Sequence, residues 1–402
     1  MHFRRSQGFR RSLATLVLLA GCAPSRSATP PAGGSAPVQP AMQPAVEQTV
    51  EPGAWRRIAE APIPTAGGMA AAWTGRQLVV WGGGSGGGGN WQASGAGAAY
   101  DPAADRWEVL PTAPVAARIG ASAVWTGREV LFWGGQAGRQ TIFADGAAYD
   151  PATRRWRTVP AAQIGGRTEH QATWTGREMI VWGGYARCCP TDSVIHDPAA
   201  GAYDPATDRW RRIAAVPPPW SGDDGTAVTV VDGGRPLVWR RGHLGAYDPA
   251  ADGWSDVPGT RPPPAAARPD DGATPSSTTG DPVAVAAATG GEVFTWTGNT
   301  GRPLDGLAYR PSDSTWRRTS PLDAQTGSGI VAAGPDRLFV AAGQSARVLE
   351  YRIAVDRWAE LPLPPIPTRS AAALVWTGSE LVVWGGNGDE GPEMDGAIWH
   401  CC

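Results

Sequence analysis

The sequence predicts an all-β fold, a seven-bladed β-propeller of four-stranded antiparallel blades, and three observations lead to this prediction. Gly and Pro, with 54 and 38 residues, are frequent enough to disfavour a helical protein, because both interrupt helices. The 20 Trp and the 42% of hydrophobic residues provide too much apolar surface for a disordered chain. An internal repeat of roughly 50 residues is typical of propeller blades.

Each repeat contains two sequence blocks. The first is an apolar run that ends in Trp-Gly-Gly, as in residues 78–83, with near copies that contain Trp133, Trp182 and Trp384. The second is a Tyr followed seven positions later by a Trp, and this pair occurs six times: Tyr100 and Trp107, Tyr149 and Trp156, Tyr203 and Trp210, Tyr247 and Trp254, Tyr309 and Trp316, Tyr351 and Trp358. The apolar run predicts a strand that is buried on both faces. The Asp-Pro that follows most of the tyrosines predicts a turn between two further strands.

Each unit therefore supplies four strands, which we name a to d from the first to the last. The count leaves the ring incomplete, because Trp55 precedes any strand a and the last unit ends at residues 399–402 without a strand d. We expect residues 54–59 to form the missing outer strand of the seventh blade, since this closes the ring and removes a free sheet edge.

The N-terminus predicts a bacterial lipoprotein. Residues 1–21 combine four Arg with a short apolar core, which is typical of a signal peptide and too short to span a bilayer. They end in Leu-Ala-Gly before Cys22, so we expect Cys22 to carry the lipid that anchors the chain to the bacterial cell membrane, on its extracytoplasmic side. Residues 22–54, rich in Pro and Ala, are expected to be a disordered tether to the propeller at 55–402.

The topology predicts a top face, formed by the b–c loops and the entrances to strand a, that points away from the membrane. Arg118, Arg167 and Arg369 each lie seven positions before the Trp of strand a, and we expect them at the upper mouth of the central channel. In the degenerate blades the matching positions are near Asp224 and Asp281. Such a ring could bind a polar or anionic ligand through guanidinium contacts, or its arginines could simply pair with acids and water.

Aromatic residues outside the repeat positions are expected around this mouth. Trp91, Tyr185 and Trp220 belong to b–c or d–a loops, where they would suit sugar faces or protein partners. The glycine run 82–89 does not resemble a phosphate loop, because no Gly-Lys-Ser or Gly-Lys-Thr follows it. No metal or other cofactor is predicted.

Two further segments stand apart from the repeat. Cys188-Cys189 and Cys401-Cys402 are adjacent pairs on opposite faces, and each could be bridged within the pair, free, or bonded to another molecule. Residues 259–281, rich in Pro, Ala and Ser, are predicted to be a mobile insert between blades four and five.

The double glycine, the Tyr and the Trp seven positions later resemble the kelch repeat, a family that folds as a propeller. The resemblance covers about residues 55–402 but is weaker where Arg240-Arg241 and Thr297-Gly298 replace the glycines, and where Trp399 replaces the Tyr. Galactose oxidase shares this propeller, but its copper site needs two His and two Tyr, and most Tyr here belong to the repeat.

Another kelch-type relative, N-acetylneuraminate epimerase, acts on acidic sugars. That resemblance implies a site in which Arg118, Arg167 and Arg369 fix a carboxylate, while Glu169 or His170 moves a proton at the anomeric centre.

The leading interpretation is a membrane-anchored monomer that binds a protein or glycan through the top face. The alternatives are a carbohydrate-active enzyme, such as a mutarotase or epimerase of sialic acid, and a structural scaffold of an envelope complex. The formal net charge of −2, which becomes −6 when residues 1–21 and their four Arg are removed, argues against a nucleic-acid partner.

Overall fold

A computed structural model describes residues 53–401 apart from 64–66, 86–91, 139–140, 188–193, 219, 222–227, 233–234, 241–242, 258–282, 298–302, 323–329, 342–346, 370–371 and 389–390. The chain divides into residues 1–48 and a compact unit at 49–402. The predictions for residues 1–21, for Cys22 and for the insert at 259–281 therefore lie outside the described residues, as does nearly all of the tether. Among the described residues, no helix has the length and apolar character needed to cross a bilayer.

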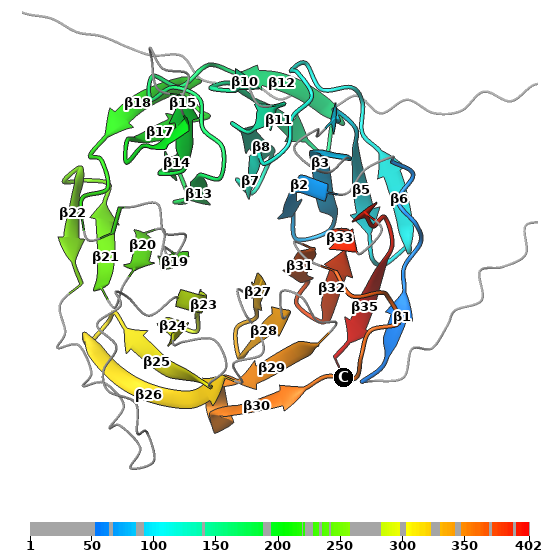
Figure 1. The fold of residues 1–402 in the computed structure, drawn as a ribbon, viewed down its shortest axis with the longest axis vertical. Helices are drawn as coiled ribbons and strands as arrows, with labels where there is room; N and C mark the ends of the chain where they lie inside the picture. The colour runs from blue at the N-terminus through cyan, green and yellow to red at the C-terminus, as the bar shows by residue number, and fades with distance from the viewer. Residues whose placement is uncertain are drawn as a thin grey trace, which may run out of the picture. The chain divides into compact units, whose positions relative to one another are not determined.

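The described chain forms seven antiparallel four-stranded sheets arranged in a ring, which confirms the predicted propeller (Figure 1). Blade one consists of β2 (Gly67–Trp73), β3 (Leu78–Ser85), β5 (Gly97–Asp101) and β6 (Arg106–Val109), with the short β4 (Gln92–Ala93) paired to β3. Blade two consists of β7 (Ser122–Trp125), β8 (Val130–Trp133), β11 (Gly146–Asp150) and β12 (Arg155–Val159). Blade three consists of β13 (Gln171–Trp174), β14 (Met179–Trp182), β17 (Ala200–Asp204) and β18 (Arg209–Ile213).

The remaining blades follow the same order from the inner strand a to the outer strand d. Blade four has β19 (Val228–Asp232), β20 (Arg235–Arg240), β21 (His243–Asp248) and β22 (Gly253–Asp256). Blade five has β23 (Val283–Thr289), β24 (Glu292–Thr297), β25 (Leu304–Arg310) and β26 (Thr315–Leu322). Blade six has β27 (Ile330–Ala333), β28 (Arg337–Ala341), β29 (Val348–Arg352) and β30 (Arg357–Glu360), with the 3-10 turn η2 (Ile353–Val355) before β30.

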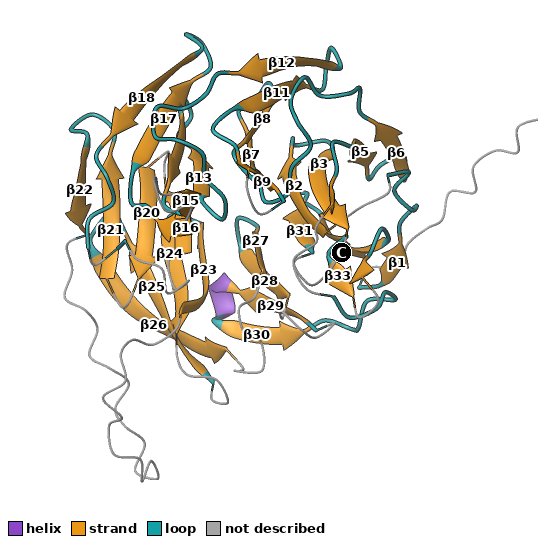
Figure 2. Ribbon diagram, turned by 45° about the horizontal axis from the view of Figure 1, so that its top comes forward, coloured by secondary structure: helices purple, strands orange, loops and turns teal. Residues whose placement is uncertain are grey.

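Blade seven is completed by the N-terminal strand, as the sequence predicted. Its sheet has the order β1 (Trp55–Arg57), β35 (Gly396–His400), β32 (Glu380–Trp384) and β31 (Ala373–Trp376). Trp55 is the cross-strand partner of Trp399, in the same register as the Tyr and Trp of the other blades. The ring is therefore closed between the two ends of the described chain: β1 lies beside β35 in Figure 1 and near the end marked C in Figure 2.

The core lies in the b strands and in the aromatic pairs of strands c and d. All four residues of β8 and all four of β14 are buried, as expected for strands covered on both faces. In six of the seven blades, all except blade five, the indole N–H of the strand-d Trp also joins neighbouring blades, because it donates to a carbonyl of the preceding blade. Trp107 donates to Ala59 at 2.8 Å, and Trp55 donates to Pro362 at 2.6 Å across the closing interface.

A second inter-blade contact, which we call the arginine clasp, is built on the residue after the strand-d Trp. Arg157 of blade two donates to Glu129 of its own blade and, at 2.8 Å, to the Tyr203 hydroxyl of blade three. Tyr203 donates in turn to Asp208 at 2.6 Å. The positions of Arg157 and Asp208 are occupied at three other blade interfaces by Arg56 and Asp105, Arg211 and Asp252, and Arg317 and Asp356. Between blades one and two the charges are exchanged, and Glu108 forms an ion pair with Arg154.

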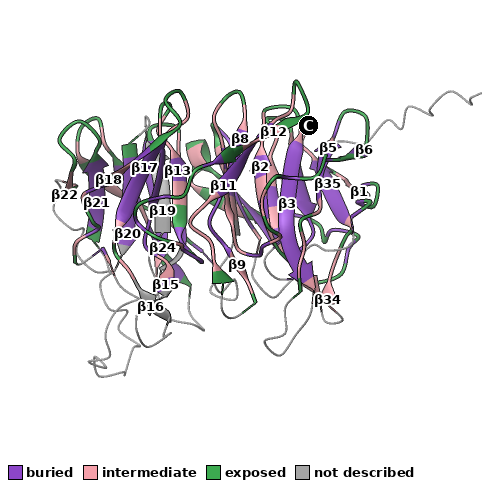
Figure 3. Ribbon diagram, turned by 90° about the horizontal axis from the view of Figure 1, so that it is seen from above, coloured by how far each residue is buried: buried purple, intermediate pink, exposed green. Residues whose placement is uncertain are grey.

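The two faces of the ring carry different connections. Short hairpins of the b–c loops project from the top face, which points downward in Figure 3. They are formed by β9 (Gln136–Ala137) with β10 (Thr141–Ile142), β15 (Tyr185–Arg187) with β16 (Val194–His196), and β33 (Asn387–Gly388) with β34 (Gly391–Pro392). The a–b and c–d turns form the bottom face.

Candidate functional site

The three arginines predicted at the channel mouth lie at the base of the top-face loops, and each is buried beside an aspartate of its own blade. Arg118, with 1% of its side chain exposed, donates from Nη1 to the carboxylate and the backbone carbonyl of Asp145, both at 3.0 Å, and to the Gly134 carbonyl at 3.2 Å. Its guanidinium also lies 4.0 Å from the ring centre of Phe143. Burial lowers the pKa of Arg118, and Asp145 opposes this shift.

Arg369 repeats this arrangement in blade seven. Its Nη1 lies 2.7 Å from Asp395 Oδ1 and donates to the Gly385 and Asp395 carbonyls. In blade three, Arg167 Nη2 lies 3.0 Å from Asp197 Oδ2, and burial lowers the pKa of Arg167. We call these three Arg–Asp pairs the loop braces, because each ties the entrance of strand a to the b–c loop of the same blade.

The braces agree with the second alternative from the sequence, in which the three arginines pair with acids. A buried guanidinium must be paired, and the nearest carboxylates are those at the ends of the b–c loops. The guanidinium groups are therefore enclosed in the loop bases and do not form the wall of an exposed pocket. Asp224 and Asp281 lie outside the described residues.

A sequence pattern that the Tyr–Trp repeat does not include marks these aspartate partners. Asp145 and Asp395 each precede the glycine that begins strand c, in two of the blades that carry the arginine. Blade one has Ala66 at the arginine position and Ala96 at the aspartate position, so both members of the pair are absent together.

His170 and Glu169, the candidate proton carriers, are in contrasting environments. His170 is buried, its Nε2 lies 2.8 Å from the Ser122 hydroxyl, and its ring packs edge-on against Trp133. Burial, together with the Arg167 charge, lowers the pKa of His170 to about 3, so the ring is neutral at physiological pH and is a weak base. Glu169 is exposed and has a φ of 55°, at the position where blades one and two have glycine.

The two aromatic candidates among the described residues, Trp220 and Tyr185, have different environments. Trp220 is buried in the core of blades three and four and packs near Trp254, so its indole does not line the top face as predicted. Tyr185 is half-buried at the start of β15 and pairs through its backbone with Thr168. Trp91 lies outside the described residues.

The cysteines can be placed only in part. Cys401 is half-buried after β35, with its sulfur 2.7 Å from Arg337 Nη1 of blade six. Cys188, Cys189 and Cys402 lie outside the described residues.

What distinguishes one half of the top face is the length of its b–c loops. The loops between strands b and c span residues 385–395 in blade seven, 86–96 in blade one, 134–145 in blade two and 183–199 in blade three. In blades four, five and six they span only 241–242, 298–303 and 342–347. The long loops thus belong to four consecutive blades, and the three loop braces belong to blades in this group.

The comparisons agree with this architecture. A family model described as "KLHDC2/KLHL20/DRC7 Kelch-repeats domain" matches residues 68–270, half of the chain. Among solved structures, a fungal alcohol oxidase of the AA5 family in complex with copper has a TM-score of 0.64 and 14% sequence identity, over 87% of this chain and 76% of that chain. At this identity the likeness shows a shared fold. A search of curated proteins finds no match.

Because that structure contains copper, the metal-binding side chains of this chain are of interest. Within the part of the chain that is described, no three His, Cys, Asp or Glu side chains gather as a metal site. The hydroxyls of Tyr100, Tyr203, Tyr247 and Tyr351 each donate to an aspartate in a c–d turn. These residues do not fit a copper centre, and we derive no copper chemistry from them.

Proposed function

The chain belongs to the kelch-repeat family, and on that premise we propose that it is a lipid-anchored, extracytoplasmic binding protein whose top face binds a protein or glycan partner. The observation that supports this most is the group of long b–c loops on blades seven, one, two and three. Loops held by a rigid scaffold are the usual place for recognition, because they can vary without disturbing the core.

The loop braces support the same proposal. Each brace fixes the end of a long loop at the point where strand c begins, as Arg118 does through three acceptors in blade two. A loop whose base is already ordered loses less conformational entropy when it binds, so more of the contact energy appears as affinity.

The position of the first described residue supports a tether that enters at the bottom face. The amide of Gly53 donates to the carbonyl of His400 at 2.9 Å, at the end of β35 away from the b–c loops. A chain anchored at Cys22 and entering there would leave the top face directed away from the membrane.

Lipid anchoring is tested by replacing Cys22 with Ala in the full chain. We expect the wild-type protein in the membrane fraction, with incorporation of labelled palmitate, and the variant in the soluble fraction without label. A variant that stays in the membrane fraction would contradict the anchor.

Partner binding is tested by shortening one long loop. Replacing residues 387–393 by Asn-Gly keeps Asp395 and its pair with Arg369, and we expect it to reduce capture of the protein or glycan partner from an envelope extract about tenfold. Deletion of the insert at 259–281 is the matched control, and it should leave capture unchanged. Equal capture by wild type and the loop variant, with both folded, would contradict a role for this loop.

A further inference from the structure

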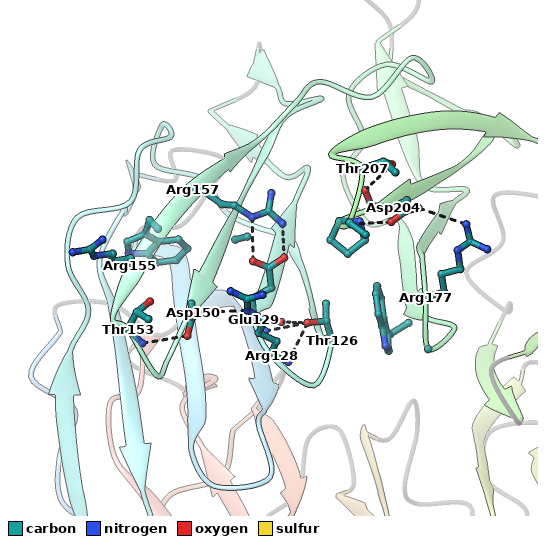
Figure 4. A pocket seen from close by; sticks show the side chains of 16 residues that line it. Thr126, Arg128, Glu129, Asp150, Thr153, Arg155, Arg157, Arg177, Asp204 and Thr207 are labelled. Atoms are coloured by element: carbon teal, nitrogen blue, oxygen red, sulfur yellow. Dashed lines mark hydrogen bonds and ion pairs between the residues drawn. The ribbon is translucent and has the colours of Figure 1, made fainter. Parts of the chain in front are cut away.

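We propose that the bottom face carries a separate binding site for a carboxylated saccharide, in the groove between blades two and three (Figure 4). The groove has a volume of about 720 Å³, within the usual range of ligand sites. It is formed by the a–b and c–d turns of the two blades, on the face opposite the long b–c loops. This site is independent of the function proposed for the top face.

The walls of the groove are held in place by the arginine clasp. Arg157 and Glu129 of blade two make a two-point ion pair, and Arg157 reaches across to the Tyr203 hydroxyl of blade three. Because these groups satisfy one another, they form a fixed polar wall that spans the blade interface. Figure 4 shows the paired Arg157 and Glu129 facing the residues of blade three across the groove.

The rim of the groove carries exposed arginines whose ion pairs are long or absent among the described residues. Arg128 and Arg177, with 86% and 82% of their side chains exposed, lie 4.0 and 3.8 Å from Asp150 and Asp204, at the outer limit of an ion pair. Arg155, the third rim arginine, makes no ion pair with another described residue. Exposed pairs of this kind contribute little, so the guanidinium groups can turn to a ligand carboxylate at small cost.

The groove also offers aromatic surface. Trp156 of β12 and Trp174 of β13 both line it and both are half-buried. Indole rings beside planar hydrogen-bonding groups suit sugar rings, which have apolar C–H faces and polar edges. The threonine hydroxyls of the turns, such as those of Thr153 and Thr207, supply further polar contacts.

The neighbouring groove between blades three and four shows why this one is different. Its volume is smaller, about 500 Å³, and its lining includes Arg177, Glu178 and Arg211 but no aromatic residue. By strand register, the position of Trp174 in blade three is occupied by Val231 in blade four. The combination of an aromatic wall with three rim arginines thus occurs in the groove between blades two and three.

Calorimetric titration of the full chain with trigalacturonic acid tests the proposal, with galactotriose as the neutral probe. We expect trigalacturonic acid to bind and galactotriose to bind about tenfold more weakly, since it lacks the carboxylates that the arginines contact. Affinity for the acid should also fall with added salt.

Three variants locate the site. Arg177→Ala should weaken binding of trigalacturonic acid about tenfold, whereas Arg76→Ala, the matched rim arginine of blade one, should leave it unchanged. Ala206→Trp, at an exposed turn position, should fill the groove and abolish binding without disturbing the core.

Absence of binding at millimolar trigalacturonic acid would overturn the proposal, as would binding that Ala206→Trp leaves intact. Vesicles of phosphatidylglycerol provide a final comparison. If the vesicles bind through Arg177 and trigalacturonic acid does not bind, the groove binds an anionic membrane surface and the saccharide proposal is wrong.

Discussion

Trp55 is the residue on which closure of the ring can be tested most directly. Its strand β1 is joined to β35 only by noncovalent contacts, and its indole donates to the Pro362 carbonyl of blade six and packs 5.5 Å from Trp399. We expect Trp55→Ala to release β1 and open the propeller between its first and last strands.

The expected magnitude follows from the burial of the side chain. Replacing a fully buried Trp by Ala costs about 3–5 kcal/mol, and because Trp55 is half-buried we expect a loss of about 2–3 kcal/mol. Trp55→Phe keeps the aromatic packing and removes the N–H donor, so it should cost about 1 kcal/mol.

Urea unfolding of the full chain measures these losses, and Trp358→Ala is the matched control. Trp358 is also half-buried at the strand-d position, and its indole also donates to a preceding blade, to the Ser320 carbonyl at 3.2 Å. The two Ala variants should be destabilised to a similar extent, because in a closed ring the seventh interface resembles the others.

Hydrogen exchange separates closure from general destabilisation. The amide of His400 donates to the Ala54 carbonyl, so it should exchange faster in Trp55→Ala and not in Trp358→Ala. If Trp55→Ala changes the free energy of unfolding by less than about 0.5 kcal/mol, the size of an ordinary surface substitution, and leaves His400 protected, the ring does not depend on β1.

Three further predictions concern the interior and the clasps. Because the pKa of His170 is lowered in the folded state to about 3, the unfolded chain binds the extra proton as pH falls below about 6.5, so stability falls with pH. Wild type should lose about 2 kcal/mol more than His170→Phe between pH 8 and pH 5 in urea unfolding, and equal losses would contradict a buried neutral ring. Arg154→Asp should cost up to about 1 kcal/mol, because it faces Glu108, and adding Glu108→Arg should restore stability; a double-mutant cycle without coupling would refute the clasp. Asp145→Ala should destabilise the fold by about 1–3 kcal/mol, because Arg118 then keeps only backbone carbonyl acceptors, and a circular-dichroism melt unchanged from wild type would show that the brace is dispensable.

The sequence by itself determined the architecture of the propeller. The constant spacing of Tyr and Trp predicted six of the seven blades, since each pair forms one cross-strand contact, as Tyr100 and Trp107 do. The surplus Trp55 and the unfinished unit at Trp399 predicted the closing strand. The Tyr–Trp inference succeeded because it depends on the hydrogen-bonding register within one blade, where the interacting residues are close in sequence. The closing strand was predictable because the unfinished sheet would otherwise leave a free edge.

Only the tertiary structure decided which polar residues face solvent. The repeat placed Arg118 at the entrance to strand a, but its burial depends on Asp145, which the b–c loop returns to the same point. Trp220 was read as a surface aromatic, yet packing between two blades encloses it. At the groove of the bottom face, Arg157 donates a hydrogen bond to the Tyr203 hydroxyl of the next blade. These contacts join residues that are 27 and 46 positions apart, and the local sequence pattern around either residue does not determine their distance or their exposure.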